Sequence, residues 1–310
     1  MKQFRARNSV SLCFGNFFRY GCISFLFVAF LVCLPIKADQ EPAFELPRTQ
    51  VVEIQDSGTK RVYELHIQLP HNYSDEKKYS VVYLTDSPYT FPITTGAARY
   101  PVNFKRMENV MFVGISWQKG HSPSLSRQRD YTPTPSSPGF KDLSGEAARH
   151  LAFIRDDVIP YIEQRFSTDA ENRTYIGNSF GGLFGMYIFL TAPDIFKNYI
   201  LGSPSVWWDN KYILTLESKT RIHQNIEANL FISVGADEIP AKDSPKNDMV
   251  GDAKEFYTRL ENRNLKKLNL EFRVIENATH ATAFPTTAVQ GLWWLFNTDT
   301  GLAVKKYHQI

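Results

Sequence analysis

Short runs of apolar residues alternate with helix-like periods along most of this chain, and this alternation limits the fold more than any other feature. Runs that suit strands buried on both faces recur at residues 79–84, 110–115, 174–176, 199–201, 229–234 and 268–275. Helical periods, with apolar residues three or four apart, fall between the later runs, for example at residues 151–162, 253–260 and 289–296. Strand and helix in turn predict a largely parallel sheet.

The first two predicted strands differ in pattern from the later, fully apolar runs. Residues 51–54 and 61–69 alternate apolar and polar side chains, which predicts an antiparallel pair. An antiparallel start followed by alternating strands and helices is the layout of the α/β-hydrolase fold, with helices on both faces of a mostly parallel central sheet. Residues 117–140 are rich in Ser, Pro and Arg and lack a clear period, so we expect a loop there that shapes the substrate site.

The first 38 residues have the layout of a signal peptide. Lys2, Arg5, Arg7 and Arg19 precede an apolar run at residues 22–36, and Ala38 stands at a suitable cleavage point. The run is shorter than the roughly 20 residues that a spanning helix needs, so cleavage is favoured over a retained membrane anchor. Lipidation of Cys33 is disfavoured because large residues precede it. We therefore expect an exported protein, periplasmic or secreted, with an α/β-hydrolase domain at residues 39–310.

Charge and cysteine content limit the binding partners and cofactors that the domain at residues 39–310 could have. Five of the 35 basic residues and none of the 32 acidic ones lie in the leader, so residues 39–310 hold 30 basic and 32 acidic residues, a net charge of −2. Such a domain has no overall field to attract nucleic acid. All three cysteines lie at or before Cys33, so the domain has no thiol for a disulfide, a nucleophile or a metal. We expect no metal and no cofactor.

Residues 177–181 read Gly-Asn-Ser-Phe-Gly and match G-x-S-x-G, with a strand before them and a helical stretch after them. A nucleophile elbow needs this setting, because the serine occupies a strained turn that leaves no room for side chains two residues either side. The pattern predicts Ser179 as a nucleophile. The alternative is a glycine-rich turn that only packs a helix against a strand, which would not predict catalytic partners later in the chain.

Both partners follow in the expected order. Residues 235–238, Gly-Ala-Asp-Glu, come at the carboxyl end of one predicted strand, and His280 follows the last one. A serine hydroxyl is a weak nucleophile at neutral pH, so His280 would take its proton, and a carboxylate would orient the ring and stabilise its charged form. From position alone, Glu238 and Asp237 are both candidates for that acid.

Five segments resemble the Putative esterase family of α/β hydrolases, which includes enterochelin and bacillibactin esterases, esterase D and feruloyl esterases. They are residues 84–87, 129–133, 177–182, 203–208 and 278–285, in the family's order. The resemblance implies Ser179 as the nucleophile and His280 as the base. It favours Glu238 as the acid, with Asp237 as the second choice. Asn178 replaces the family's commoner histidine, and we expect it to pack or to form hydrogen bonds.

The oxyanion hole is less clear from the sequence. The backbone N–H of Phe180 should be one donor, and the other should come from the loop after residues 79–84. Relatives often have Asp-Gly where this chain has Asp86 and Ser87, and Pro88, which follows, has no N–H to give. The second donor is therefore expected to be Ser87 or Tyr89.

Five residues are candidates for substrate binding. Asp86 lies in the family's loop motif, and Trp207 and Trp208 could line an acyl or aryl pocket or equally fill the core. Arg127 and Arg129 could attract an anionic substrate such as a catecholate siderophore, although Arg129 could instead pair with Asp130.

Together these patterns predict a serine-dependent carboxylic-ester hydrolase that acts through an acyl-enzyme on a small-molecule ester. A periplasmic esterase of catecholate trilactone siderophores is the alternative within the same class. A ligand-binding relative that keeps the fold without turnover is the alternative from another class.

Overall fold

The computed structural model describes residues 44–135, 143–222, 224–243 and 246–298, and its compact unit begins at Glu45. One eight-stranded sheet runs through that unit in the order β1-β2-β4-β3-β5-β6-β7-β8. The strands are β1 (Thr49–Gln55), β2 (Val62–Gln68), β3 (Tyr79–Leu84), β4 (Met111–Ile115), β5 (Thr168–Asn178), β6 (Asn198–Gly202), β7 (Ala228–Gly235) and β8 (Leu268–Ile275). The predicted leader lies outside the described residues.

The pairing confirms the predicted fold class. β1 pairs with β2 and β2 pairs with β4 in antiparallel fashion, and every other pair of neighbours is parallel. β3, β4 and β6 are buried along their whole length, which is why their sequences are continuous apolar runs. The carboxyl ends of the parallel strands meet at one edge, where α/β sheets place their sites.

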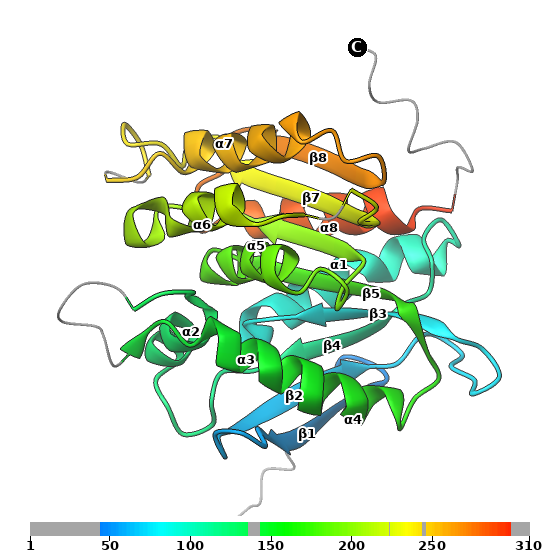
Figure 1. The fold of residues 1–310 in the computed structure, drawn as a ribbon. Coiled ribbons are helices and arrows are strands. Elements are labelled where there is room, and N and C mark those ends of the chain that lie inside the picture. The colour runs from blue at the N-terminus through cyan, green and yellow to red at the C-terminus, as the bar shows by residue number, and fades with distance from the viewer. Residues whose placement is uncertain (1–43, 136–142, 223, 244–245, 299–310) are drawn as a thin grey trace, which may run out of the picture. The chain divides into compact units, whose positions relative to one another are not determined.

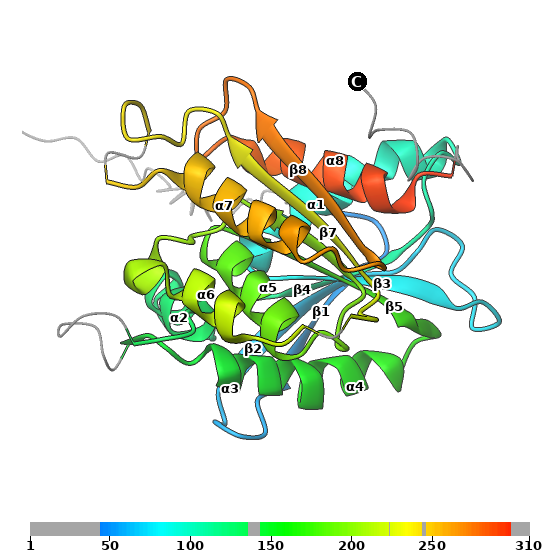
Figure 2. The same ribbon diagram turned by 45° about the horizontal axis from the view of Figure 1, so that its top comes forward.

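Helices cover both faces of the sheet (Figures 1 and 2). α1 (Ser87–Asn103) and α8 (Ala283–Phe296) lie together on one face. The other face carries α2 (Pro123–Tyr131), α3 (Ala147–Phe153), α5 (Phe180–Thr191), α6 (Trp208–Lys219) and α7 (Met249–Asn262). A π-helical stretch, η2 (Ile154–Val158), joins α3 to α4 (Ile159–Glu163). No helix in the described ranges is long and apolar enough to cross a membrane.

Each face of the sheet has its own apolar cluster. The larger one lies under α3 and α5 to α7 and includes Tyr175, Phe184 and Phe189, whereas the smaller one lies under α1 and α8 and includes Phe91 and Leu292. Burying a side chain of this size contributes roughly 1.5–3 kcal/mol. The two clusters thus fix the sheet between its helices and hold the carboxyl ends of the parallel strands in place.

The structure corrects the predicted loop at residues 117–140, because part of it is helix α2. Pro123 stands in the first turn of α2, where a proline costs no hydrogen bond. The buried side chains of α2 are mostly polar, and they form hydrogen bonds with one another and with Tyr63 of β2. A search for apolar residues at helical spacing therefore does not detect this helix.

Candidate active site

Ser179 sits at the sharp turn between β5 and α5. Its backbone has φ 59° and ψ −117°, a conformation that a residue with a side chain rarely adopts. Three hydrogen bonds hold it there. Ser179 N donates to Gly202 O at 2.9 Å, and Ser179 O accepts from Leu183 N at 3.0 Å and from Ser205 N at 3.1 Å. These hydrogen bonds to β6, to α5 and to the segment after β6 thus hold the strained backbone of Ser179 in place.

The glycines of the turn are required by contact. A Cβ on Gly177 would collide with the carbonyl group of Gly181, and one on Gly181 would lie 2.6 Å from Thr85 Oγ1. Real Cβ atoms do not approach other atoms so closely, so a side chain at either position would open the turn. The G-x-S-x-G pattern therefore follows from the local geometry of the Ser179 turn.

Glu238 and His280 meet at the same edge of the sheet. Glu238 follows β7 and is completely buried, while His280 lies between β8 and α8 with its side chain 38% exposed. Glu238 Oε2 lies 2.6 Å from His280 Nδ1. Since the carboxylate accepts, Nδ1 carries the proton, which leaves Nε2 of the neutral ring as the proton acceptor.

The second oxygen of Glu238 is also bound. Oε1 accepts a hydrogen bond from Ser203 Oγ at 2.5 Å and one from Gly235 N at 2.8 Å. The backbone of His280 is held as well, because its N–H donates to Asp243 Oδ2 at 2.6 Å. Asp237 instead forms an exposed ion pair with Lys242 at 2.5 Å. Of the two acids considered from sequence, Glu238 is the one that contacts the histidine.

Ser179 Oγ has Ser205 Oγ as its hydrogen-bond partner, at 3.3 Å. Among the described residues, no hydrogen bond joins Ser179 Oγ to the His280 ring. Catalytic hydrogen bonds are often long without substrate and shorten when it binds, so this arrangement is compatible with proton transfer from Ser179 to His280.

The two expected sources of the second oxyanion donor differ in the structure. Tyr89 N donates to Asp86 O at 2.9 Å, so this group is already used in the first turn of α1. Tyr89 is therefore a poor donor, a correction to the sequence prediction. Ser87 is the first residue of α1, where a backbone N–H has no partner within the helix. Phe180 holds the same place in α5.

Arg127 lies beside the nucleophile turn. Its Nε and Nη2 donate to Asp86 Oδ1 and Oδ2 at 3.1 and 2.9 Å, Nη2 also lies 3.5 Å from Asn178 O, and the guanidinium stands 5.3 Å from the centre of the Phe180 ring. Burial alone would lower the pKa of Arg127, but Asp86 outweighs it and the net shift is upward. The group thus stays charged, and its side chain is 24% exposed.

Asp86 is buried and acts as a support for Arg127. Its Oδ1 also accepts from Trp117 Nε1 at 2.6 Å, and its backbone N donates to Tyr131 OH at 3.3 Å. A carboxylate with three donors has little capacity left for substrate. The structure therefore favours a positioning role for Asp86 over direct substrate binding.

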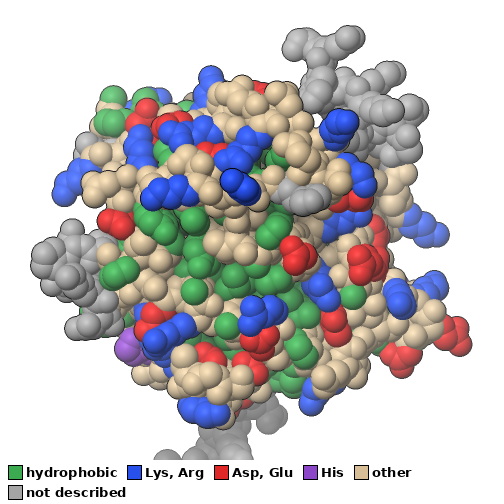
Figure 3. All heavy atoms as spheres, in the orientation of Figure 1, with side chains coloured by type: hydrophobic (Ala, Val, Ile, Leu, Met, Phe, Trp, Pro, Cys, Tyr) green, Lys and Arg blue, Asp and Glu red, His purple; other side chains and the backbone are tan. Residues whose placement is uncertain are grey.

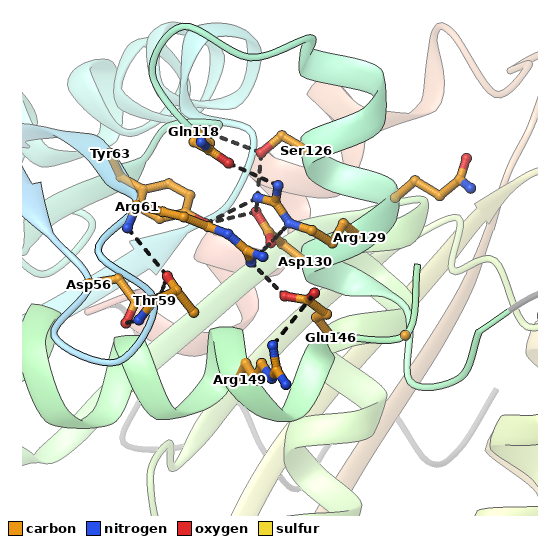
Figure 4. A network of polar contacts seen from close by, with 12 residues as sticks. Asp56, Thr59, Arg61, Tyr63, Gln118, Ser126, Arg129, Asp130, Glu146 and Arg149 are labelled. Atoms are coloured by element: carbon orange, nitrogen blue, oxygen red, sulfur yellow. Dashed lines mark hydrogen bonds and ion pairs between the residues drawn. The ribbon is translucent and has the colours of Figure 1, made fainter. Parts of the chain in front are cut away.

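Arg129 is buried in a network of polar contacts (Figure 4). Its Nε and Nη2 donate to Asp130 Oδ1 and Oδ2 at 2.8 and 2.9 Å, and Nη1 donates to Gln118 Oε1 at 2.8 Å. Arg129 thus takes the structural pairing that the sequence left open. A residue so enclosed is unsuited to attract substrate, which corrects that expectation.

The two tryptophans divide their roles. Trp208 is buried and its Nε1 donates to Thr134 O at 3.1 Å, so it belongs to the core. Trp207 is partly exposed. Both indoles pack on Phe180, with ring centres 5.8 Å (Trp207) and 5.2 Å (Trp208) away. Of the two, Trp207 is the better candidate for a pocket wall.

Sequence reasoning missed the contacts made by Ser203 and Ser205. Both belong to the segment at residues 203–208 and directly follow β6, at the edge where Ser179 and Glu238 lie. Polar side chains just after a central strand are the signal that would have found them. In the described ranges, no three His, Cys, Asp or Glu side chains come together as a metal site would require.

The chain is similar in sequence and fold to known esterases. The family model described as Putative esterase matches residues 57–284. Ferri-bacillibactin esterase BesA of Bacillus subtilis is 30% identical over 274 residues, covering 83% of this chain and 92% of BesA. The BES protein from Bacillus cereus superposes with a TM-score of 0.71 at 25% identity, covering 83% of this chain and 98% of that one. An IroE-like serine hydrolase from Shewanella oneidensis gives 0.69 at 25% identity, with 80% of each chain covered.

The fold and these likenesses define an α/β hydrolase of the serine-esterase class. The chain belongs to the Putative esterase family.

Proposed function

We propose that this protein hydrolyses carboxylic esters through an acyl-enzyme, with Ser179 as nucleophile, His280 as base and Glu238 as the supporting acid. The observation that carries the proposal is the 2.6 Å contact between Glu238 and His280 at the sheet edge that also holds the strained Ser179 turn. Membership of the esterase family supports it.

In this mechanism, Ser179 Oγ attacks the ester carbonyl carbon while His280 Nε2 takes the hydroxyl proton. The tetrahedral oxyanion accepts hydrogen bonds from the N–H groups of Phe180 and Ser87. The C–O bond to the alcohol then breaks, and His280 returns the proton to the leaving oxygen. Water attacks the acyl-enzyme by the same route, which releases the acid and restores Ser179.

The test combines turnover with labelling. Ser179→Ala should lower the kcat for a nitrophenyl ester by several orders of magnitude and abolish covalent labelling by a fluorophosphonate. Ser218→Ala, which removes an exposed hydroxyl on α6, is the matched control. Full turnover or full labelling in Ser179→Ala would show that another residue is the nucleophile. A wild-type protein that binds esters without turnover would support the ligand-binding alternative.

A catecholate trilactone siderophore is the second candidate substrate. Two observations favour it: the likeness to a ferri-bacillibactin esterase, and a charged, partly exposed Arg127 beside the nucleophile turn. Since Arg129 is buried, Arg127→Gln alone should raise KM for the ferric trilactone, with added salt imitating the effect, while nitrophenyl acetate hydrolysis stays nearly level. If Arg127→Gln affected both substrates equally and the wild type did not prefer the trilactone, the siderophore-esterase proposal would be rejected. The general esterase proposal would remain.

We also propose that the protein is exported, on the basis of residues 1–38 alone. N-terminal sequencing of the protein recovered from the cell envelope or the medium should find a start near Asp39. An intact N-terminus on a membrane-bound protein would indicate an anchor instead.

A further inference from the structure

The outward faces of α1 and α8 are apolar where a surface helix is normally polar. On α8, the exposed residues Pro285, Val289 and Trp293 recur every four positions, so they form one stripe. α1 exposes a second stripe along its own length. Together they make what we term the α1–α8 face: Tyr89, Ile93, Tyr100, Phe104, Val289 and Trp293, which are 70%, 36%, 73%, 62%, 41% and 41% exposed.

These two helices are almost free of charge. Neither contains an acidic residue, and Arg99 is the single basic one. α7, on the opposite face of the sheet, carries acidic and basic residues along its length. Figure 3 shows that opposite face, where many Lys, Arg, Asp and Glu side chains surround a central region of hydrophobic side chains. Six of the large apolar side chains that are at least 36% exposed lie on or directly after α1 and α8, which marks the α1–α8 face as a surface adapted to a partner.

Basic residues gather at the carboxyl end of α1. Lys77, Lys78 and Lys105 line a cavity of about 990 Å³ there, and Arg99 lies one turn back along the helix. Within the described ranges, none of these four cations has an ion-pair partner. Glu108 is the acid that lines the cavity, and its Oε1 accepts from Ser80 Oγ at 2.7 Å. The exposed aromatic rings thus adjoin an excess of positive charge.

The polypeptide also enters the domain on the side of α1. Glu45 and Leu46 line a smaller cavity of about 440 Å³ together with Pro88 and Phe91 of α1.

We propose that the α1–α8 face docks on a lipid bilayer with anionic headgroups. Tyr and Trp rings favour the boundary between headgroups and acyl chains, and unpaired Lys and Arg attract lipid phosphates. A second copy of the chain fits less well. A two-fold contact would bring two copies of the same patch together, and neither helix supplies an acid to offset the cations. The amino end of α1, with Ser87 and Tyr89, would then hold the active site close to the membrane surface.

The test is flotation of the chain from Asp39 with vesicles. This piece contains the whole described sheet and both apolar clusters, so it has the parts that a domain needs to fold. It should float with vesicles of phosphatidylcholine mixed with phosphatidylglycerol, less with pure phosphatidylcholine, and less at high salt.

Variants locate the surface. The triple change Tyr100→Ser, Phe104→Ser and Trp293→Gln and the double change Arg99→Glu and Lys105→Glu should each weaken binding by at least about tenfold. The control, Lys254→Glu with Lys266→Glu, makes the same charge change at exposed positions elsewhere and should stay within about twofold. Turnover of a soluble aryl ester should stay level in all three, which shows that they fold.

Failure of the wild type to float, or equal binding by the face variants and the wild type, would overturn the proposal. So would sedimentation showing a dimer in the wild type that becomes a monomer in the triple variant, because the partner would then be a second copy of the chain.

Discussion

Glu238 and Asp130 are both buried carboxylates with several hydrogen-bond donors, yet they have different kinds of partner. Glu238 faces the ring of His280, a partly exposed imidazole whose second nitrogen is placed to exchange a proton with a nucleophile or a leaving group. Asp130 faces Arg129, a buried group that stays charged. Burial and hydrogen bonds alone therefore do not mark a catalytic acid. The exposure and the proton chemistry of the partner separate the two cases.

The cost of removing each carboxylate should differ in kind. Asp130 also accepts from Tyr63 OH at 3.0 Å and Ser126 Oγ at 3.1 Å, and it lies 3.7 Å from Arg61 Nη1, so it joins β2 to α2. Burial, reinforced by Asp130, raises the pKa of Tyr63, which keeps its hydroxyl as a donor. Loss of Asp130 should act on stability, and loss of Glu238 on turnover.

The largest expected effect is on turnover in Glu238→Gln. The glutamine oxygen can still accept from Ser203 Oγ and Gly235 N, but its amide would donate to His280 Nδ1 and impose the wrong tautomer on the ring. We expect kcat to fall by roughly 10³- to 10⁴-fold while thermal unfolding changes little. Steady-state kinetics with a nitrophenyl ester measures this. A loss of only a few fold would mean that a Ser179–His280 pair acts without the acid.

The second effect is on stability, in Asp130→Asn. The change leaves the buried guanidinium of Arg129 without its counter-charge, which costs about 3–5 kcal/mol when one partner of a buried pair is removed. Urea unfolding should show this loss, whereas kcat per folded molecule should stay within about tenfold of the wild type. A stable Asp130→Asn with a large loss of kcat would break the contrast with Glu238.

Most of the fold could be predicted from the sequence, because buried parallel strands must be apolar throughout and the Ser179 turn must exclude side chains at Gly177 and Gly181. It did not predict α1, whose sequence has two internal prolines and a polar mixture at buried positions. Nor could it place Arg129, whose pairing depends on Asp130 meeting Tyr63 from a strand distant in sequence. The contact between Glu238 and His280 agrees with the predicted order, while their catalytic roles stay predictions.

A third effect concerns pH and His150, which lies beside the Asp130 network. The rings of Tyr63, Tyr131, Phe153 and Phe184 surround it, and its buried Nε2 has no hydrogen-bond partner among the described residues. Burial lowers the pKa of His150. Below about pH 6.5, the unfolded chain then binds a proton that the folded one resists, so stability falls as the pH drops.

In His150→Phe, this loss of stability should be smaller. Unfolding free energies at pH 7.5 and pH 5 measure the slope, to which one histidine contributes at most about 1.4 kcal/mol per pH unit. Burial also lowers the pKa of His66, but that residue is present in both proteins, so the difference in slope isolates His150. Parallel pH profiles for the two proteins would show that His150 carries no such linkage.

The smallest effect sharpens the comparison at the site itself. Asp237 precedes Glu238 in the same loop, but its carboxylate pairs with Lys242, whose side chain is 58% exposed, and not with His280. An exposed pair of this kind contributes about 0–1 kcal/mol, and its loss leaves the tautomer of His280 unchanged. Asp237→Asn should therefore keep kcat within about twofold of the wild type and lower stability by less than about 1 kcal/mol. The same ester assay and urea curve used for Glu238→Gln measure both. If Asp237→Asn instead lost more turnover than Glu238→Gln, the loop would have to rearrange during catalysis, and the role of the acid would pass to Asp237.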